Sequence, residues 1–246
     1  MGFVRGLATV LFLIGLPVVL VTTNVRFAAN EGRIYEQGFD KYDAASATGL
    51  GRDEVSRAGR ELRRYFNNDQ ETVRIIVNEG GREVSLFSER ETSHLRDVKD
   101  LFRLTFRAQE IGIVFVFTYI VGVFVWAREG SLRRLAVETL AAGLATVAVI
   151  LGLGAVAVTG FQGAFEQFHF IAFDNDLWRL NPRTDHLIQM FPEDFWFDVS
   201  LLVGVMTLVE AGVLALASGL YLGLTRPRVL TVLAPSGQPS PTGTSP

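Results

Sequence analysis

Residues 165–198, FEQFHFIAFDNDLWRLNPRTDHLIQMFPEDFWFD, lie between two long apolar runs, so we expect this stretch to lie at a membrane surface. It holds two of the three histidines of the chain, His169 and His186. An imidazole beside carboxylates in an aromatic setting is suited to chemistry on lipid. Widened to 161–198, the segment holds ten aromatic residues: Phe161, Phe165, Phe168, Phe170, Phe173, Trp178, Phe191, Phe195, Trp196 and Phe197. The alternative interpretation of these aromatics is a belt that anchors a loop at the lipid headgroups.

The composition favours a membrane protein. Apolar residues make up 49% of the 246 residues and gather in four blocks, and the net charge is −3. No basic tract is dense enough to bind nucleic acid, so we expect no nucleic-acid partner. Because the chain has no cysteine, it can form neither a disulfide nor a thiolate metal site, and it has no cysteine nucleophile.

The four apolar blocks predict transmembrane helices at 1–23, 110–127, 135–160 and 199–225, because about 20 apolar residues span the ~30 Å hydrocarbon layer. A cleaved signal peptide is the alternative for the first block. Its apolar run is long for a signal peptide, and the bulky Phe27 stands where cleavage after Ala29 would need a small residue. We therefore expect an uncleaved anchor.

Short loops rich in arginine face the cytoplasm. Two such segments follow the second and fourth blocks, and their arginines are Arg128, Arg133, Arg134, Arg226 and Arg228. The rule places the loop 128–134 and both termini in the cytoplasm, and it places 24–109 and 161–198 outside. The segment 161–198 agrees with this, since it has two arginines against seven acids. The tail 226–246 has too few apolar residues to fold and is predicted to be disordered.

Residues 24–109 are predicted to fold into a small α+β extracytoplasmic cap. They hold 15 Lys or Arg and 15 Asp or Glu, yet Val55, Ala58, Leu62 and Tyr65 would share one face of a helix. TVRIIV and REVSLF are typical of two strands about a glycine-containing turn. Ser88 to Glu91 has the form of a capping box. It begins a helix predicted over about 89–109, which can continue into the second apolar block.

The predicted fold is thus a mainly α integral membrane protein with four transmembrane helices and a small α+β cap. The cap and the segment 161–198 share one side of the membrane and are separated only by a helical hairpin. They can therefore meet over the outer headgroups and build one site together.

The histidines are the candidates for chemistry. Asp97, three residues after His94, can accept the Nδ1 proton of that histidine and leave Nε2 free as a base; the alternative is a surface histidine with a local ion pair. Asp174 and Asp176 can orient His169 or bind a polar headgroup, or His169 can be an ordinary loop residue at the interface.

The remaining features favour structural interpretations. His186 is expected to start a helix lying along the membrane. Zinc held by the three histidines with an aspartate is an alternative, but there is no HExxH motif and no histidine pair at close helical spacing, so we predict no metal site. Glu210, inside the fourth span, is a functional candidate by its depth or a group bonded to a neighbouring helix.

The chain has no G-x-S-x-G, P-loop or G-x-G-x-x-G motif, so an enzyme of this kind would take its nucleophile from the substrate and use no cofactor.

Four stretches resemble the motifs of the bacterial lipoprotein intramolecular transacylase family, called Lit. They are ETSHLRDVKDLF at 91–102, the F-x-x-FH element at 165–169, NDLWRLNP at 175–182 and LIQMFPEDFW at 187–196. The arrangement of four spans, a cap after the first and an aromatic segment between the third and fourth is also similar. The resemblance covers nearly the whole chain except the tail.

The resemblance implies a bacterial cytoplasmic-membrane enzyme with two catalytic histidines, which by motif would be His94 and His169. It implies a lipoprotein substrate with an N-terminal S-diacylglyceryl-cysteine, whose sn-2 acyl chain moves to the α-amine of the same cysteine. One histidine would be the base, and the other the acid or oxyanion donor. Asp97, Asp174 and Asp176 are the expected orienting residues. The expected substrate-binding residues are Phe168, Phe170, Asn175, Trp178 and Trp196.

Two other functions remain open at this point. One is a non-catalytic envelope protein whose cap binds membrane lipid or a partner protein. The other is a hydrolase of lipid esters.

Overall fold

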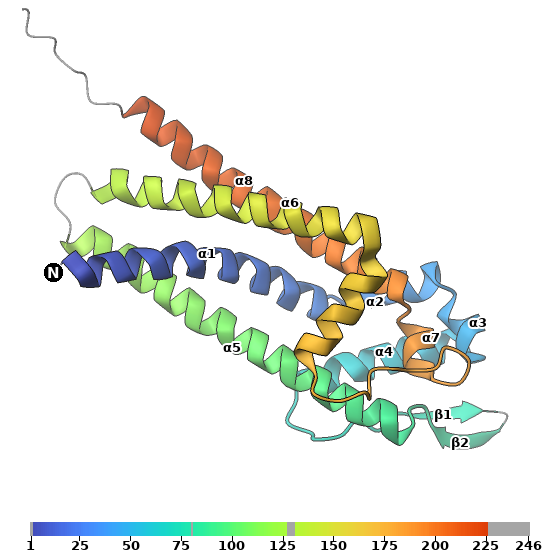
Figure 1. Ribbon diagram of the computed structural model, residues 1–246. Coiled ribbons are helices and arrows are strands. Elements are labelled where there is room, and N and C mark those ends of the chain that lie inside the picture. Colours follow the sequence, from blue (N-terminus) through green and yellow to red (C-terminus); the bar gives the residue numbers. More distant parts are fainter. Residues whose placement is uncertain (1, 80, 127–130, 226–246) are drawn as a thin grey trace, which may run out of the picture.

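The computed structural model describes residues 2–79, 81–126 and 131–225. Four long helices lie side by side in it: α1 (Gly2–Asn30), α5 (Glu89–Trp126), α6 (Ser131–Ala172) and α8 (Glu193–Leu224) (Figure 1). Each is long and apolar enough to cross a membrane. Part of the predicted cytoplasmic loop, including Arg128, and the predicted disordered tail 226–246 with Arg226 and Arg228 lie outside the described residues.

Helix α5 belongs to both halves of the molecule. Its 38 residues extend for about 57 Å at 1.5 Å per residue, nearly twice the thickness of a hydrocarbon layer. The prediction that the helix starting at Glu89 continues into the second apolar block is confirmed. The N-terminal half of α5 therefore projects out of the bundle and carries His94 beside the small elements at that end.

The bundle packs on a few apolar residues, among them Phe12, Leu16, Val116 and Ala142. Many of the other apolar side chains of the four helices are exposed, as expected for helices that face lipid. Polar side chains also link the helices, at several places along the bundle. Near one end, Tyr119 Oη donates to Glu138 Oε2 (2.7 Å).

In a second link, Asn24 Nδ2 of α1 donates to Thr207 Oγ1 (3.0 Å) and Glu210 Oε2 (2.9 Å) in the middle of α8. Of the two interpretations of Glu210, this geometry supports a bond to a neighbouring helix.

Six short elements gather at one end of the bundle (Figure 1), and we call them the cap: α2 (Gly32–Lys41), α3 (Ala44–Thr48), α4 (Arg52–Phe66), β1 (Ile76–Glu79), β2 (Arg82–Ser85) and α7 (His186–Met190). The strands form the predicted antiparallel hairpin, in which Ile76 faces Ser85. In the turn between the strands, Gly81 has a left-handed φ of 87°, a backbone conformation that residues other than glycine rarely adopt.

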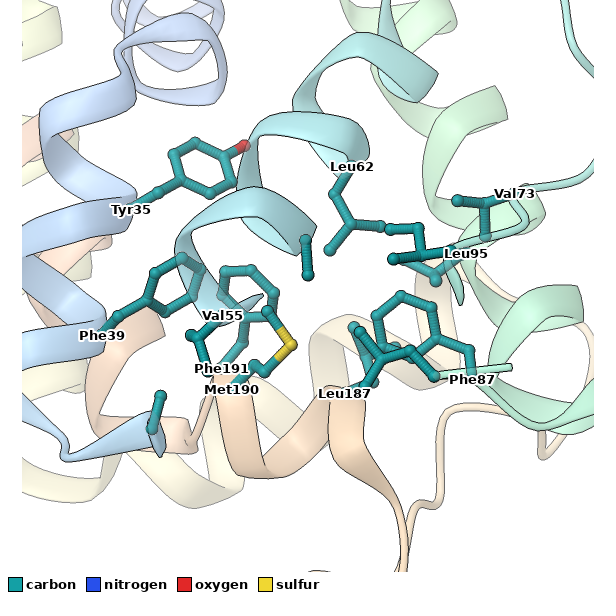
Figure 2. Packing of buried hydrophobic residues seen from close by; sticks show 14 of the residues in the cluster. Tyr35, Phe39, Val55, Leu62, Val73, Phe87, Leu95, Leu187, Met190 and Phe191 are labelled. Carbon is teal, nitrogen blue, oxygen red and sulfur yellow. The ribbon is translucent and has the colours of Figure 1, made fainter. Parts of the chain in front are cut away.

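The core of the cap is built from both ends of the sequence. The predicted apolar face of α4 is buried, with Leu62 fully covered and Val55 only 1% exposed. Leu187, Met190 and Phe191, more than 100 residues further along the chain, pack into the same cluster (Figure 2). The segment between the third and fourth apolar blocks is therefore part of the cap.

The segment 161–198, predicted as an aromatic loop, is helical over 161–172. These residues continue α6 beyond a break at Gly160, where φ is −174° and ψ is 62°. The aromatics Phe161, Phe165 and Phe168 recur at helical spacing, which favours this helix. After the break the last turns of α6 change direction and run toward α5 (Figure 1), and His169 is on these turns.

Candidate functional site

Two imidazoles meet where the end of α6 reaches the projecting half of α5. The ring centroids of His94 and His169 are 6.1 Å apart, and the ring planes are inclined by 35°. Only 6% of His94 and 7% of His169 is exposed. The two candidate catalytic residues, which are far apart in the sequence, therefore share one buried site.

Aromatic rings enclose the pair. Phe173 contacts both imidazoles, with centroid distances of 5.2 Å to His94 and 5.6 Å to His169. The rings of Phe165 and Phe168 are steeply inclined to that of His169, with centroid distances of 4.4 and 5.3 Å. Such surroundings exclude water and strengthen electrostatic interactions with any group that enters.

The backbone of its own helix orients His169. Its Nδ1 lies 2.7 Å from the carbonyl oxygen of Phe165, one turn earlier. A carbonyl oxygen can only accept, so Nδ1 carries the proton and, in the neutral ring, Nε2 carries a free lone pair. The predicted partners Asp174 and Asp176 do not take this role; Asp174 is exposed and Asp176 pairs with Arg179 (3.3 Å).

His94 lacks the partner that its sequence context predicted. Within the part of the chain that the structure describes, its buried Nδ1 has no hydrogen-bond partner. The carboxylate of Asp97 instead accepts a hydrogen bond from Asn175 Nδ2 (2.9 Å). Asp97 therefore ties the loop after α6 to α5.

Burial keeps both imidazoles neutral at physiological pH. The two residues lie outside the transmembrane segments predicted at 110–127 and 135–160. Burial, with the neighbouring His169 ring as a smaller cause, lowers the pKa of His94 from 6.5 to about 4. Burial also lowers the pKa of His169, although its hydrogen bond to Phe165 opposes this change. A neutral imidazole can accept a proton at one nitrogen and donate a hydrogen bond from the other.

The N-terminus of α5 holds the loop that follows α6. Glu91, which is 1% exposed, accepts from Ser88 N (2.8 Å) through Oε2 and from Leu187 N (2.7 Å) through Oε1. Ser88 Oγ accepts from Glu91 N (3.3 Å), which confirms the capping box. Arg90 also donates to backbone carbonyl oxygens of the loop.

Sequence reasoning missed the structural roles of Glu91 and Arg90. The capping box predicted the contact between Glu91 and Ser88. It gave no signal for the bond between Glu91 and Leu187 N, because these residues are far apart in the sequence.

The other predicted site residues divide into near and far groups. The rings of Trp178 and His169 lie 4.8 Å apart, and the edge of Phe170 meets Trp178 at 5.3 Å. Phe168 and Phe170 are about half exposed, so they border the site on the outside. Trp196 packs near Phe165, with ring centroids 6.5 Å apart, and is not among the rings described above that surround the histidines.

His186 begins α7, as predicted, and its Nδ1 lies 2.9 Å from the carbonyl oxygen of Leu86. It fastens α7 to the residues before α5. Among the residues that the structure describes, no three His, Asp or Glu side chains are close enough together to hold a metal ion.

Comparisons with known proteins agree with this architecture. The family model "Lipoprotein intramolecular transacylase Lit" matches residues 10–196. Among solved structures, the lipoprotein intramolecular transacylase Lit from Bacillus cereus superposes with a TM-score of 0.73 at 17% identity, over 91% of this chain and 98% of that chain. A variant of the same protein with a histidine-to-alanine substitution gives a TM-score of 0.69 at 16% identity, over 91% and 96% of the two chains.

A curated relative, an uncharacterized protein of Aquifex aeolicus, is 28% identical over 134 residues. The match covers 54% of this chain and 56% of that relative, so it spans about half of the relative's length.

Proposed function

The chain belongs to the lipoprotein intramolecular transacylase family Lit, a family of multi-pass membrane proteins, and we propose that it moves the sn-2 acyl chain of an N-terminal diacylglyceryl-cysteine lipoprotein to the α-amine of that cysteine. The observation that supports this most directly is the meeting of His94 and His169, whose ring centroids are 6.1 Å apart in a buried aromatic site. Two imidazoles at this spacing can act together on one ester, where the α-amine attacks and the glyceryl oxygen departs.

The proposed orientation places the cap outside the cytoplasmic membrane and both termini inside. The start of α6, which carries Arg133 and Arg134, lies at the end of the bundle opposite the cap (Figure 1), and these arginines support the orientation by the positive-inside rule. The histidines would then lie at the level of the outer headgroups, where the thioether-linked diacylglycerol of a lipoprotein is found.

His169 is the proposed base. The attacking α-amine has a reference pKa of ~7.7–8.0 and must be neutral to attack. Because Nδ1 of His169 donates to Phe165, the lone pair on Nε2 is free to take a proton from the amine as the N–C bond forms. The resulting imidazolium can return that proton to the glyceryl oxygen when the C–O bond of the ester breaks. One residue thus carries the proton from the nucleophile to the leaving group.

His94 is the proposed electrophilic partner. Its pKa of about 4 keeps the ring neutral, so it is a poor source of a whole proton near pH 7. A neutral imidazole N–H can still donate a hydrogen bond to the ester oxygen that becomes negative in the tetrahedral intermediate. In this assignment no protein nucleophile takes part.

Enclosure of the substrate supplies the rest of the rate. Amine and ester belong to one molecule, and well-oriented intramolecular reactions reach effective molarities of ~10⁵–10⁸ M. The rings of Phe165, Phe168 and Phe173 around the histidines would also keep water from the ester. Transfer would therefore be favoured over hydrolysis.

The test is a mass measurement. The chain is expressed in a host that supplies diacylglyceryl-lipoprotein, and the N-terminal lipopeptide is fragmented in a mass spectrometer. Transfer leaves the total mass unchanged and moves one acyl chain to nitrogen. Hydrolysis would remove the mass of one acyl chain, and a binding protein would leave the lipopeptide unaltered; either result contradicts the proposal.

His94→Ala and His169→Ala are each expected to abolish the N-acylated product. The matched control is His186→Asn, which replaces the third histidine of the chain and retains a donor for the carbonyl oxygen of Leu86. This control should retain most of the activity. Full activity in either alanine variant would refute the two-histidine site.

A further inference from the structure

Two buried side-chain nitrogens have no hydrogen-bond partner in the described part of the chain: Nδ1 of His94 and Nε1 of Trp178. Both belong to residues whose rings adjoin His169, at 6.1 and 4.8 Å. A buried donor without a partner costs about 1–3 kcal/mol, so proteins rarely keep one without a use. Because both rings lie beside His169, a partner for these nitrogens at the proposed reaction site would account for them.

The chemistry of the indole limits what Trp178 can bind. Its Nε1–H donates and never accepts, so the complementary atom must be an acceptor such as a carbonyl oxygen or an oxyanion. The substrate of an acyl transfer offers such an atom in the ester carbonyl, whose oxygen becomes negatively charged when the amine attacks.

Trp178 is held in place by its surroundings. The guanidinium of Arg179 lies 5.1 Å from the centre of the indole, and Phe170 meets the indole edge-on. The preceding backbone is fixed by Asn175, whose Oδ1 accepts from Leu177 N (3.0 Å) while its Nδ2 donates to Asp97 of α5. Asn175, predicted to bind substrate, therefore positions the loop that carries the indole.

We propose that Trp178 is a catalytic residue whose Nε1–H binds the sn-2 ester carbonyl oxygen and stabilises the oxyanion, together with the N–H of His94. This inference rests on the proposed transacylation and deepens it.

In the step itself, the lone pair of the α-amine forms the N–C bond and the π electrons of the carbonyl move to its oxygen. The oxyanion accepts hydrogen bonds from Trp178 and His94, and both residues keep their protons. His169 takes one proton from nitrogen. When the carbonyl re-forms, the C–O bond breaks and the glyceryl oxygen leaves with the proton from His169. Atoms, electrons and protons balance without any further reactant.

The test removes the N–H and keeps the ring. Trp178→benzothienylalanine, which has sulfur in place of the indole N–H, is made by amber suppression and assayed with a dipalmitoylglyceryl-cysteine peptide in nanodiscs. Loss of one oxyanion donor typically lowers kcat by about 10²–10³-fold, and we expect a fall of this order with KM changed less than about threefold. The same replacement at Trp126, at the opposite end of α5 from His94, is the matched control and should retain full activity.

Each other outcome has a definite meaning. An unchanged kcat, or a raised KM with unchanged kcat, would overturn the inference and leave the proposed transacylase in place, because the wild type still transfers. A wild type that does not transfer would overturn both.

A measurement on the wild type covers the case in which the replaced protein does not fold. The ¹⁵N-indole signal of Trp178, assigned by elimination with Trp126→Phe and Trp196→Phe, should move downfield when a phosphonate analogue of the ester is added. A signal that does not move would overturn the inference.

Discussion

Glu91→Gln is expected to weaken the attachment of the segment after α6 to the N-terminus of α5. The native carboxylate uses one oxygen for Ser88 N–H and the other for Leu187 N–H, and it is almost wholly buried. A glutamine of the same shape has one oxygen and one amino group. It can accept only one of the two bonds, and it turns a donor toward the second buried N–H.

The loss can be estimated from these contacts. A hydrogen bond to a charged group is worth about 1.5–3 kcal/mol, and an unpaired buried N–H costs about 1–3 kcal/mol. The lost bond and the unpaired N–H partly count the same loss of free energy, so the two values are not simply added. We expect the free energy of unfolding to fall by about 3 kcal/mol. In a chain of this size that corresponds to a fall in Tm of roughly 6–12 °C. The transfer rate should also fall, because Leu187 fixes the segment that follows His169.

The assay is thermal unfolding in detergent followed by tryptophan fluorescence, beside the transfer assay. The matched control is Glu89→Gln, which removes an exposed acid from the same first turn of α5. Its interaction with the helix dipole is worth about 0.3–1 kcal/mol. If the two variants unfold at the same temperature, the bond to Leu187 does not contribute as argued and the reasoning is wrong.

Three further predictions follow from other groups. Because burial lowers the pKa of His94 from 6.5 to about 4, the unfolded chain binds a proton between these pH values that the folded protein does not. The contribution of His94 to stability is therefore full above pH 6.5 and falls by up to about 3 kcal/mol as the pH drops toward 4. Tm measured against pH should fall less in His94→Gln than in the wild type, because that variant keeps the lowered pKa of His169 but not that of His94. Lys99→Met removes donors to Asn68 Oδ1 and Gln70 O, so limited proteolysis should cut the segment after α4 faster, with transfer activity changed less than about threefold. Glu210→Gln keeps an acceptor for Asn24 and should transfer at nearly the native rate, whereas Glu210→Leu should unfold about 1 kcal/mol more easily. A Gln variant that folds but no longer transfers would instead make Glu210 a functional group.

The fold was largely predictable because its signals are local. Apolar runs longer than a hydrocarbon layer is thick predict membrane helices with little ambiguity, and the hairpin and the capping box each depend on neighbours a few residues apart. The apolar face of α4 needed only helical periodicity. The proximity of the two histidines followed from the arrangement of four spans with two large segments on one side.

The partners of the histidines were not predictable in the same way. His169 is bonded to a carbonyl one turn back, a contact available only on a helix, and the segment was predicted to be a loop. An acid close in sequence to His94 was assumed to be its partner, but the fold gives Asp97 to Asn175, 78 residues away. Glu91 is bonded to Leu187 across 96 residues. Such pairings depend on tertiary packing, for which a single sequence has no signal.

The break at Gly160 makes the spacing along α6 a hidden requirement of the site. Eight residues separate Gly160 from His169, and each residue of an α-helix advances the side-chain direction by about 100°. One residue inserted or deleted between Gly160 and Phe165 would leave the hydropathy profile and every motif intact, yet it would rotate the imidazole a quarter-turn or more out of phase with His94. Homologues of this chain should therefore tolerate substitutions in this interval far better than insertions or deletions.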